Sequence, residues 1–284
     1  MRQLEHKDLE YVLHKFEKAL KEWEPTPKAD TTIRTYKQTI KKFNEYLYGV
    51  GTDLFEFGRI DVQTFVDKLL QDGKRATTIN KDFAAITTFC KWMDCEEKTR
   101  GIRVVEMQQS RNTAPKALDD LEKNRLLREV ERKGNKRDIA IVSVLLNCGL
   151  RVAELTSMKR KDVEMSERKG VIRVVGKGQK EREVRMNSKV RFALTEYLDT
   201  RSDSQEAVFL STHRKPISIR SVQTMLQKYG VHPHALRHTF VTALVRNGED
   251  FSLIQSLTGH KSADMVMRYS RPTIEEQDDA VERL

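Results

Sequence analysis

The sequence has little cysteine and lacks the features of a secreted or membrane protein. Three cysteines occur among its 284 residues, an odd number with no C-x-x-C pair, which argues against a disulfide framework or a zinc ribbon. No apolar run approaches the roughly 20 residues of a membrane helix. The N-terminal segment also lacks the apolar core of a signal peptide. We therefore expect a folded protein of the cytoplasm, with no membrane partner.

Basic side chains are in excess, and they are unevenly distributed. The net charge is +10, from 52 Lys and Arg against 42 Asp and Glu. Residues 1–110 carry 19 basic and 18 acidic side chains, whereas residues 111–284 carry 33 and 24. The last eleven residues reverse the sign, with five acids and one arginine. This distribution favours a polyanionic partner for the second half of the chain.

The first half has apolar residues at helical spacing throughout. The stripes cover residues 7–23, 33–47, 62–70 and 79–93, and four such amphipathic helices can enclose a small core. The periodicity disappears between residues 100 and 116, which predicts a linker. We expect an N-terminal helical extension (1–28), a helical domain (29–105), a linker (106–116) and a second domain (117–284). The extension is expected to pack on the helical domain or on a neighbouring protomer.

The second half mixes helices with a small amount of β structure. A D-x-x-E capping box at 119–122 and the apolar stretch 139–146 predict helices. Residues 171–175 and 181–186, separated by the turn GKGQK, predict a β-hairpin, and residues 207–211 predict a further short strand. Helical patterns return at 188–198, 218–229, 234–247 and 252–257. The predicted class is mainly α with a small β-hairpin or sheet (α+β), in two domains.

Four segments of the second half carry candidate catalytic groups. Arg151 begins a helix, a position that favours anions, and Lys177 lies between two glycines at the hairpin tip. His234 and Arg237 share one helix face. The remaining candidates, at the end of a helix and beyond it, are His260 and Tyr269.

These segments do not suggest a metal site. His234 and His238 have the i,i+4 spacing of helical metal ligands, but the H-E-x-x-H glutamate is missing and no third ligand lies at familiar spacing. Arginines, histidines, a lysine and a tyrosine suit metal-free attack on a phosphodiester. Arginine forks stabilise the charge on the non-bridging oxygens, tyrosine serves as the nucleophile, and lysine or histidine protonates the leaving oxygen. We expect no metal and no cofactor.

In this order and spacing, the motifs resemble the tyrosine recombinase (phage integrase) family. The motifs are G-L-R-x-x-E-L at 149–155, the G-K-G hairpin at 176–178, H-x-L-R-H at 234–238, L-x-G-H at 257–260 and Tyr269. The resemblance implies a helical, SAM-like core-binding domain followed by a mixed catalytic domain.

The resemblance also assigns roles to the candidate residues. Tyr269 would attack the scissile phosphate and form a 3′-phosphotyrosyl bond, and Arg151 and Arg237 would hold the non-bridging oxygens. Lys177 would protonate the 5′ leaving oxygen. His234 would help to deprotonate Tyr269, and His260 would donate a hydrogen bond to the phosphate.

The implied partner is double-stranded DNA with inverted-repeat core sites, and the implied location is the cytoplasm, associated with the nucleoid through DNA. The family works as a tetramer that exchanges strands through a Holliday junction. We expect a homotetramer, or an assembly with a related recombinase. In the family the C-terminal segment docks onto a neighbouring protomer, a role that suits the acidic tail.

The residues that contact DNA bases are less well defined by the sequence. Arginine and glutamine suit major-groove base edges, and phosphate contacts or plain solvated surface are the alternatives. The candidates are Arg34, Lys37, Thr77, Asn80, Lys81, Arg220, Gln223 and Gln227.

The subtype and two other function classes remain open. Only about 28 residues precede the expected core-binding domain, whereas integrases that bind separate arm sites carry a longer segment there. This favours an Xer-type dimer resolvase or a TnpI-type transposon cointegrate resolvase. The alternatives are a phage or mobile-element integrase, a type IB topoisomerase-like enzyme and a non-catalytic DNA-binding protein.

Overall fold

The structure is a computed structural model that describes residues 8–104, 116–176, 181–259, 262–271, 277–278 and 281–283. The chain divides into two units, residues 1–110 and 111–284, each with its own core. Within the described residues, no helix has the length and apolar character needed to cross a membrane.

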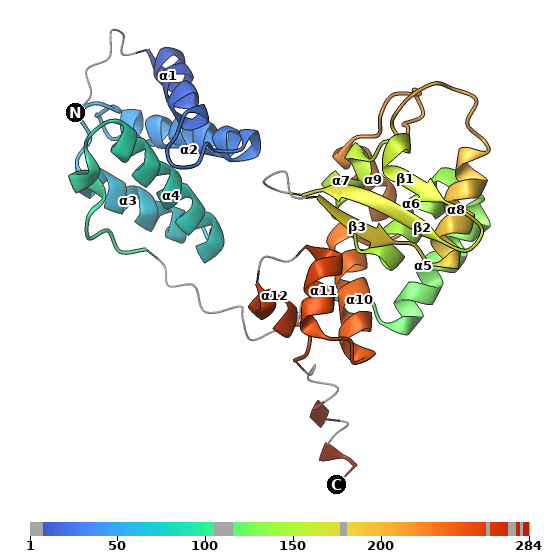
Figure 1. Cartoon of the computed structure of the whole chain (residues 1–284). Coiled ribbons are helices and arrows are strands. Elements are labelled where there is room, and N and C mark those ends of the chain that lie inside the picture. The colour runs from blue at the N-terminus through green and yellow to red at the C-terminus, as the bar shows by residue number, and fades with distance from the viewer. Residues whose placement is uncertain are drawn as a thin grey trace. The chain divides into compact units, whose positions relative to one another are not determined.

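The first unit is helical throughout its described part (Figure 1). Helix α4 packs against α1, α2 and α3, which confirms the prediction that four apolar stripes enclose one core. The elements are α1 (Leu9–Lys21), α2 (Asp30–Gly49), α3 (Arg59–Gln71), α4 (Ala76–Trp92) and the 3-10 turn η1 (Glu96–Thr99).

Helix α1 is an integral part of this core. The Phe16 side chain is fully buried, and its ring centroid lies 5.3 Å from that of Phe89 and 5.2 Å from that of Trp92. Aromatic pairs in this distance range stabilise a core beyond the area that they bury. The N-terminal helix therefore packs on its own helical domain.

The second unit combines helices with a three-stranded antiparallel sheet (Figure 1). The elements are α5 (Asp120–Lys133), α6 (Lys136–Cys148), α7 (Val152–Ser157), η3 (Arg160–Asp162), β1 (Val163–Met165), β2 (Gly170–Val175), β3 (Glu181–Arg185), α8 (Ser188–Leu198), α9 (Ile219–Gln227), α10 (Pro233–Arg246), α11 (Phe251–Thr258) and α12 (Ala263–Met267). The strand order is β1-β2-β3. Ile172 lies opposite Val184 in the register, and both are buried. The two paired strands of the predicted hairpin are thus confirmed, and residues 177–180 of its turn lie outside the described residues. The structure adds a short first strand, β1, that the periodicity did not indicate.

The short strand expected at 207–211 forms only isolated bridges, Lys159 with Ala207 and Leu210 with Pro216. Arginine side chains bind the carbonyl groups that a neighbouring strand would otherwise use. Arg137 donates to the Leu210 carbonyl at 3.1 Å, and Arg201 donates to the carbonyls of Ala207 and Val208 at 3.1 and 2.6 Å. The segment is held by these side chains together with single main-chain hydrogen bonds, such as Val208 N–H to the Met158 carbonyl at 2.9 Å, and not by a continuous ladder.

Truncation of Phe16 to alanine should lower the free energy of unfolding of the first unit by about 3–4 kcal/mol, because it opens a cavity between α1 and α4. Urea unfolding followed by tryptophan fluorescence isolates this unit, since the chain's two tryptophans, Trp23 and Trp92, both lie in it. The control is Tyr48→Ala at a side chain that is 67% exposed, which should change stability by less than about 0.5 kcal/mol. Equal effects of the two changes would contradict the packing of α1.

Candidate active site

The turn between α6 and α7 positions Arg151. Gly149 ends α6 in the left-handed conformation with φ of 59°, and an added Cβ would lie 2.2 Å from the Phe240 ring. Only glycine meets both constraints. Arg151 follows as the N-cap of α7, where its backbone N–H donates to Glu154 at 2.7 Å and its guanidinium donates to the same carboxylate at 2.9 Å.

Helix α10 positions Arg237. Pro233 begins the helix at a position where its missing N–H costs nothing. Arg237 lies one turn later and is only 4% exposed. Its guanidinium donates to the carbonyls of Gly149 and Thr258. Burial, with the nearby charge of Arg151, lowers the pKa of Arg237 to about 10, so the group remains cationic at neutral pH.

At the C-terminus of α11, three consecutive carbonyl groups each accept a hydrogen bond from a different arginine. Terminal carbonyls have no intrahelical partner, and they form the negative end of the helix dipole. The pairs are Arg182 with Leu257 at 3.2 Å, Arg237 with Thr258 at 2.7 Å and Arg151 with Gly259 at 3.1 Å. Three guanidinium groups from α10, β3 and the start of α7 are thus fixed at one helix end.

A single buried carboxylate, Glu154, completes this cluster. Both of its oxygens accept from Arg182, at 3.0 and 2.9 Å, and both also accept from Arg151. Burial opposes its ionisation, but the hydrogen bonds from Arg182 and Arg151 outweigh burial and lower the pKa of Glu154. One carboxylate against three guanidinium groups leaves a surplus of positive charge suited to an anion.

Tyr269 lies just beyond α12 and is largely buried, at 8% exposure. It packs in a small core with Val241, Ile254 and Val266. Its hydroxyl oxygen lies 2.7 Å from Nδ1 of His238. Burial raises the pKa of Tyr269, although Arg237 and Arg268 oppose this effect, so the phenol is protonated at neutral pH.

The structure brings together four of the six candidate catalytic residues. Arg151 and Arg237 meet at the end of α11, and His234 is exposed on the helix that carries Arg237. Tyr269 joins them through His238. The other two candidates, Lys177 and His260, lie outside the described residues. Among the residues that are described, no group of His, Cys, Asp or Glu is arranged to hold a metal ion.

Two residues of this site were not selected from the sequence. Arg182 lies near the start of β3, a few positions after the hairpin tip. An arginine at such a position is ordinarily exposed to solvent, so the sequence gives no reason to place it in the site. In the sequence, His238 stands out only by its metal-ligand spacing to His234. The only signal for a place of His238 in this site was its adjacency to Arg237; its contact with Tyr269 is a tertiary one.

Two known protein families match the two units of this chain. Residues 116–276 match the phage integrase family, and residues 10–97 match the phage integrase N-terminal SAM-like domain. The first match alone covers more than half of the chain. The chain belongs to the phage integrase family.

Individual relatives extend over both units. The tyrosine recombinase XerA of Pyrococcus furiosus is 32% identical over 266 residues, which cover 90% of this chain and 88% of the relative. The tyrosine recombinase XerC of Vibrio cholerae is 33% identical over 258 residues, covering 84% and 81%. The chain is therefore a tyrosine recombinase, an enzyme that breaks and rejoins DNA at specific sites through a tyrosine intermediate.

Solved structures agree with the fold. The crystal structure of XerA recombinase aligns with a TM-score of 0.53 at 26% identity, over 96% of this chain and 97% of that one. The XerH recombinase bound to a palindromic difH substrate, in a post-cleavage complex, aligns with a TM-score of 0.73 over 98% and 97%. At 18% identity, the second likeness supports the fold alone. Both neighbours confirm the predicted mainly helical class with a small sheet.

The candidate DNA-contacting residues of this recombinase lie on two helices of the first unit and one of the second. On α9, Arg220, Gln223 and Gln227 are all exposed and follow one helix face. On α4, Thr77 and Lys81 are exposed and Asn80 is half-buried. The two residues on α2 are Arg34, which is exposed, and Lys37, whose ammonium lies 2.6 Å from Glu17.

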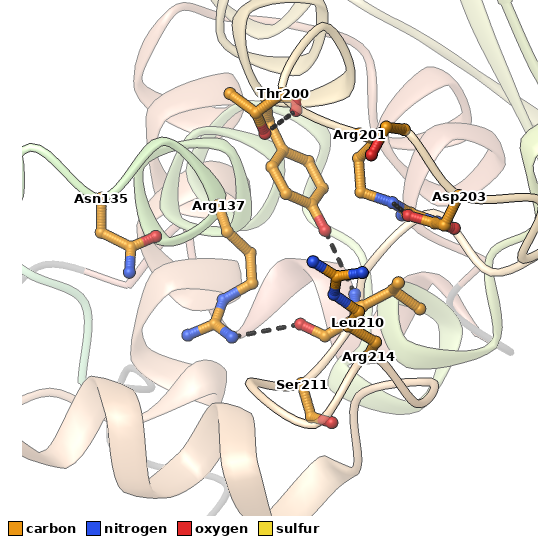
Figure 2. Close-up of a pocket in the computed structure, with 10 residues that line it drawn as sticks. Asn135, Arg137, Thr200, Arg201, Asp203, Leu210, Ser211 and Arg214 are labelled. Carbon is orange, nitrogen blue, oxygen red and sulfur yellow. Dashed lines mark hydrogen bonds and ion pairs between the residues drawn. The ribbon is translucent and has the colours of Figure 1, made fainter.

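A second arginine-rich pocket in the catalytic half is structural (Figure 2). It has a volume of about 200 Å³ and contains none of the candidate catalytic residues. Arg137 binds Asp138 at 2.8 Å, and Arg201 binds Asp203 at 2.6 Å. These arginines are engaged in holding the 199–211 segment against α6 rather than directed at a ligand.

Replacement of Glu154 by glutamine should lower the free energy of unfolding of the second unit by about 3 kcal/mol near pH 7, because it leaves the half-buried Arg151 and Arg182 without their shared carboxylate. The folded-state pKa of Glu154 lies below its usual value of 4.5. Its contribution is therefore complete above that pH, and it is lost as the pH falls through the folded-state pKa.

The stability difference between wild type and Glu154→Gln should be constant near neutral pH and shrink in acid. Urea unfolding followed by far-ultraviolet circular dichroism at several pH values measures this difference. The control is Glu206→Gln, which removes an exposed partner of Lys159 and should leave stability close to wild type. A difference that grows in acid would contradict the assigned ionisation of Glu154.

Proposed function

We propose that this tyrosine recombinase resolves DNA multimers, either transposon cointegrates or chromosome and plasmid dimers, by recombination at inverted-repeat core sites. The observation that carries the proposal is the arginine cluster at the end of α11 beside the Tyr269–His238 pair. Matches to Xer recombinases over both units support the resolvase role. An integrase of a mobile element would instead join sites on unrelated molecules.

The scissile phosphate would lie against Arg151 and Arg237. A guanidinium group has five N–H donors in a planar fork, and Arg151 uses donors of NH1 and NH2 for Glu154 and for the Gly259 carbonyl. Its side chain is 38% exposed, which leaves it accessible to a phosphate. Because the protein already fixes these groups, they stabilise the developing charge without reorganisation.

The cleavage step would proceed by in-line displacement. The Tyr269 oxygen would bond to phosphorus as the bond to the 5′ oxygen breaks, and Lys177 would give that oxygen its proton. His234 would assist the deprotonation of Tyr269, and His260 would donate a hydrogen bond to the phosphate. Strand rejoining reverses these steps and needs no external energy, because the phosphotyrosyl bond conserves the energy of the phosphodiester.

Tyr269→Phe should abolish formation of a covalent protein–DNA adduct while leaving DNA affinity within about twofold, because it removes only the nucleophilic oxygen. The measurement uses a core site nicked close to the scissile phosphate, so that the adduct accumulates, and denaturing gel electrophoresis. Tyr48→Phe, at an exposed position of the first unit, is the matched control. An adduct that persists in Tyr269→Phe would reject the nucleophile assignment.

We further propose that four protomers assemble on two sites, with the acidic tail of each bound to its neighbour. The second unit contains an apolar groove of about 640 Å³. It is lined by Leu127, Phe240 and Leu244 and by Phe192, which is 70% exposed. The proposed occupant is residues 274–284 of another protomer.

Charge and composition support this occupant. Lys123, Lys189 and Glu131 line the groove, which gives it a positive balance. The tail carries five acids and one arginine together with Val281. An anionic segment is repelled by DNA but attracted by such a groove.

Deletion of residues 274–284 should abolish the two-site synaptic complex in native gels while leaving single-site binding within about twofold, because the tail contacts protein rather than DNA. Phe192→Asp should have the same effect from the groove side. The deletion protomer keeps its groove and the Phe192→Asp protomer keeps its tail, so an equal mixture should partly restore synapsis. Failure of the mixture, or normal synapsis by either variant alone, would count against the proposed contact.

A further inference from the structure

His238 is in direct contact with the atom that reacts. Its Nδ1 lies 2.7 Å from the Tyr269 hydroxyl oxygen, and the two ring centroids are 5.6 Å apart. Tyr269 comes from the segment after α12, whereas His238 comes from the middle of α10. The contact therefore depends on tertiary packing, through a small core that includes Val241 and Val266.

The protonation states of the two side chains suit transfer of a proton from Tyr269 to His238. Burial, then the charges of His234, Arg237 and Arg268, lower the pKa of His238 to about 4. The imidazole is neutral at pH 7, and the Tyr269 phenol carries its proton. With the imidazole proton on Nε2, the phenol donates its hydrogen bond to the Nδ1 lone pair.

We propose that His238 is the catalytic base that accepts the Tyr269 proton during cleavage and returns it during rejoining. This proposal rests on the proposed role of Tyr269 as the nucleophile. The O–H bond of Tyr269 breaks and an N–H bond forms at Nδ1, while the phenolic oxygen bonds to phosphorus. The bond from phosphorus to the 5′ oxygen breaks, and that oxygen takes its proton from the acid on the opposite side. In rejoining, the imidazolium returns its proton to the departing phenolate.

Substrate binding makes His238 a stronger base. Arg237, which precedes it in the chain, is one of the charges that disfavour its protonation. A phosphate bound to Arg237 brings negative charge to the same place, and opposite charge nearby favours the imidazolium form. The proton affinity of His238 thus rises when the reacting phosphate is present.

His234 occupies a different position. It is exposed and lies one turn earlier on α10, with its ring centroid 6.3 Å from that of His238. Its exposure suits contact with the substrate phosphate. His238 thus replaces His234 as the proposed acceptor of the Tyr269 proton, because it is the histidine in hydrogen-bond contact with the phenol. His234 would then act on the phosphate side.

The decisive variant is His238→Asn. The amide group of asparagine occupies the position of Nδ1 and can keep the hydrogen bond to Tyr269, but it does not take up a proton at neutral pH. Single-turnover cleavage of a nicked core site should slow by about 100-fold or more in both His238→Asn and His238→Ala, in line with the loss of a general base. DNA affinity should remain within about twofold. The control is His213→Asn, which changes an exposed histidine outside the site and should cleave at the wild-type rate.

Near wild-type cleavage by His238→Asn would overturn the proposal, because it would show that the hydrogen bond only positions Tyr269. Faster cleavage by His238→Ala would also overturn it, because His238 would then restrain the nucleophile. The pH profile gives an independent readout. Wild-type cleavage should decline in acid as His238 becomes protonated, and His238→Asn should lose this decline. The groups that face His238 are His234 and Arg237 on α10, and Arg268 and Tyr269 after α12.

A substrate with sulfur in place of the bridging 5′ oxygen separates the two proton transfers, because a thiolate leaves without being protonated. It should restore cleavage by Lys177→Ala but not by His238→Asn. Restoration of His238→Asn would overturn the proposal by assigning His238 to the leaving group. Failure of the proposed function is distinct: Tyr269→Phe would then still form the covalent adduct, whatever the His238 variants do.

Discussion

The candidate active site depends on the C-terminus of α11, where three consecutive carbonyl groups bind three arginines. Neither the buried carbonyl groups nor the clustered arginines would be stable without the other. Helix-end carbonyls need donors when they are buried, and clustered guanidinium groups repel one another unless negative charge lies among them. The helix end supplies part of that negative charge as partial charges, and Glu154 supplies the rest as a buried carboxylate. The result is a cluster of positive charge that the protein itself holds in place.

This arrangement explains why segments far apart in the chain converge. Gly259 ends α11 in the left-handed conformation with φ of 66°, and an added Cβ would lie 3.2 Å from the Arg182 guanidinium. Its carbonyl binds Arg151, while the Gly149 carbonyl at the end of α6 binds Arg237. Each arginine is thus tied to a helix end near the other. Arg182 also links the strand that follows the hairpin tip to the same cluster, so β3 and α11 cannot shift independently.

Local patterns predicted the elements of the fold well, because apolar periodicity directly reflects which face of a helix is buried. The four helices of the first unit and the hairpin of the second followed from such patterns. The segment 207–211 forms isolated bridges rather than a strand, and Arg137 and Arg201 bind three of its carbonyls, contacts that no local pattern predicts. The sequence placed Arg151 at a helix start and Arg237 with His234 on one face, which are local relationships.

The contacts that organise the site are not local. Arg182 reaches Glu154 across 28 positions, and His238 reaches Tyr269 across 31. Alternation along β3 marks Arg182 only as a polar strand residue, and helical spacing cannot show which histidine of α10 meets the segment after α12. These pairings follow from how α10, α11 and α12 pack together, which depends on their cores rather than on any motif.

The net charge of the second half therefore combines two populations of basic groups with different physical behaviour. Exposed groups such as Arg220 attract DNA at a distance, and dissolved salt screens them within about 10 Å at 0.1 M. Arg182 and Arg237 are enclosed by protein, so salt screens them far less. In the proposed complex, Arg237 would interact with the phosphate only after it has reached the site, where the lower dielectric strengthens the interaction. Added salt should consequently slow the association of DNA much more than the cleavage step that follows. The formal net charge of the second half therefore overstates the electrostatic field that attracts DNA to its surface.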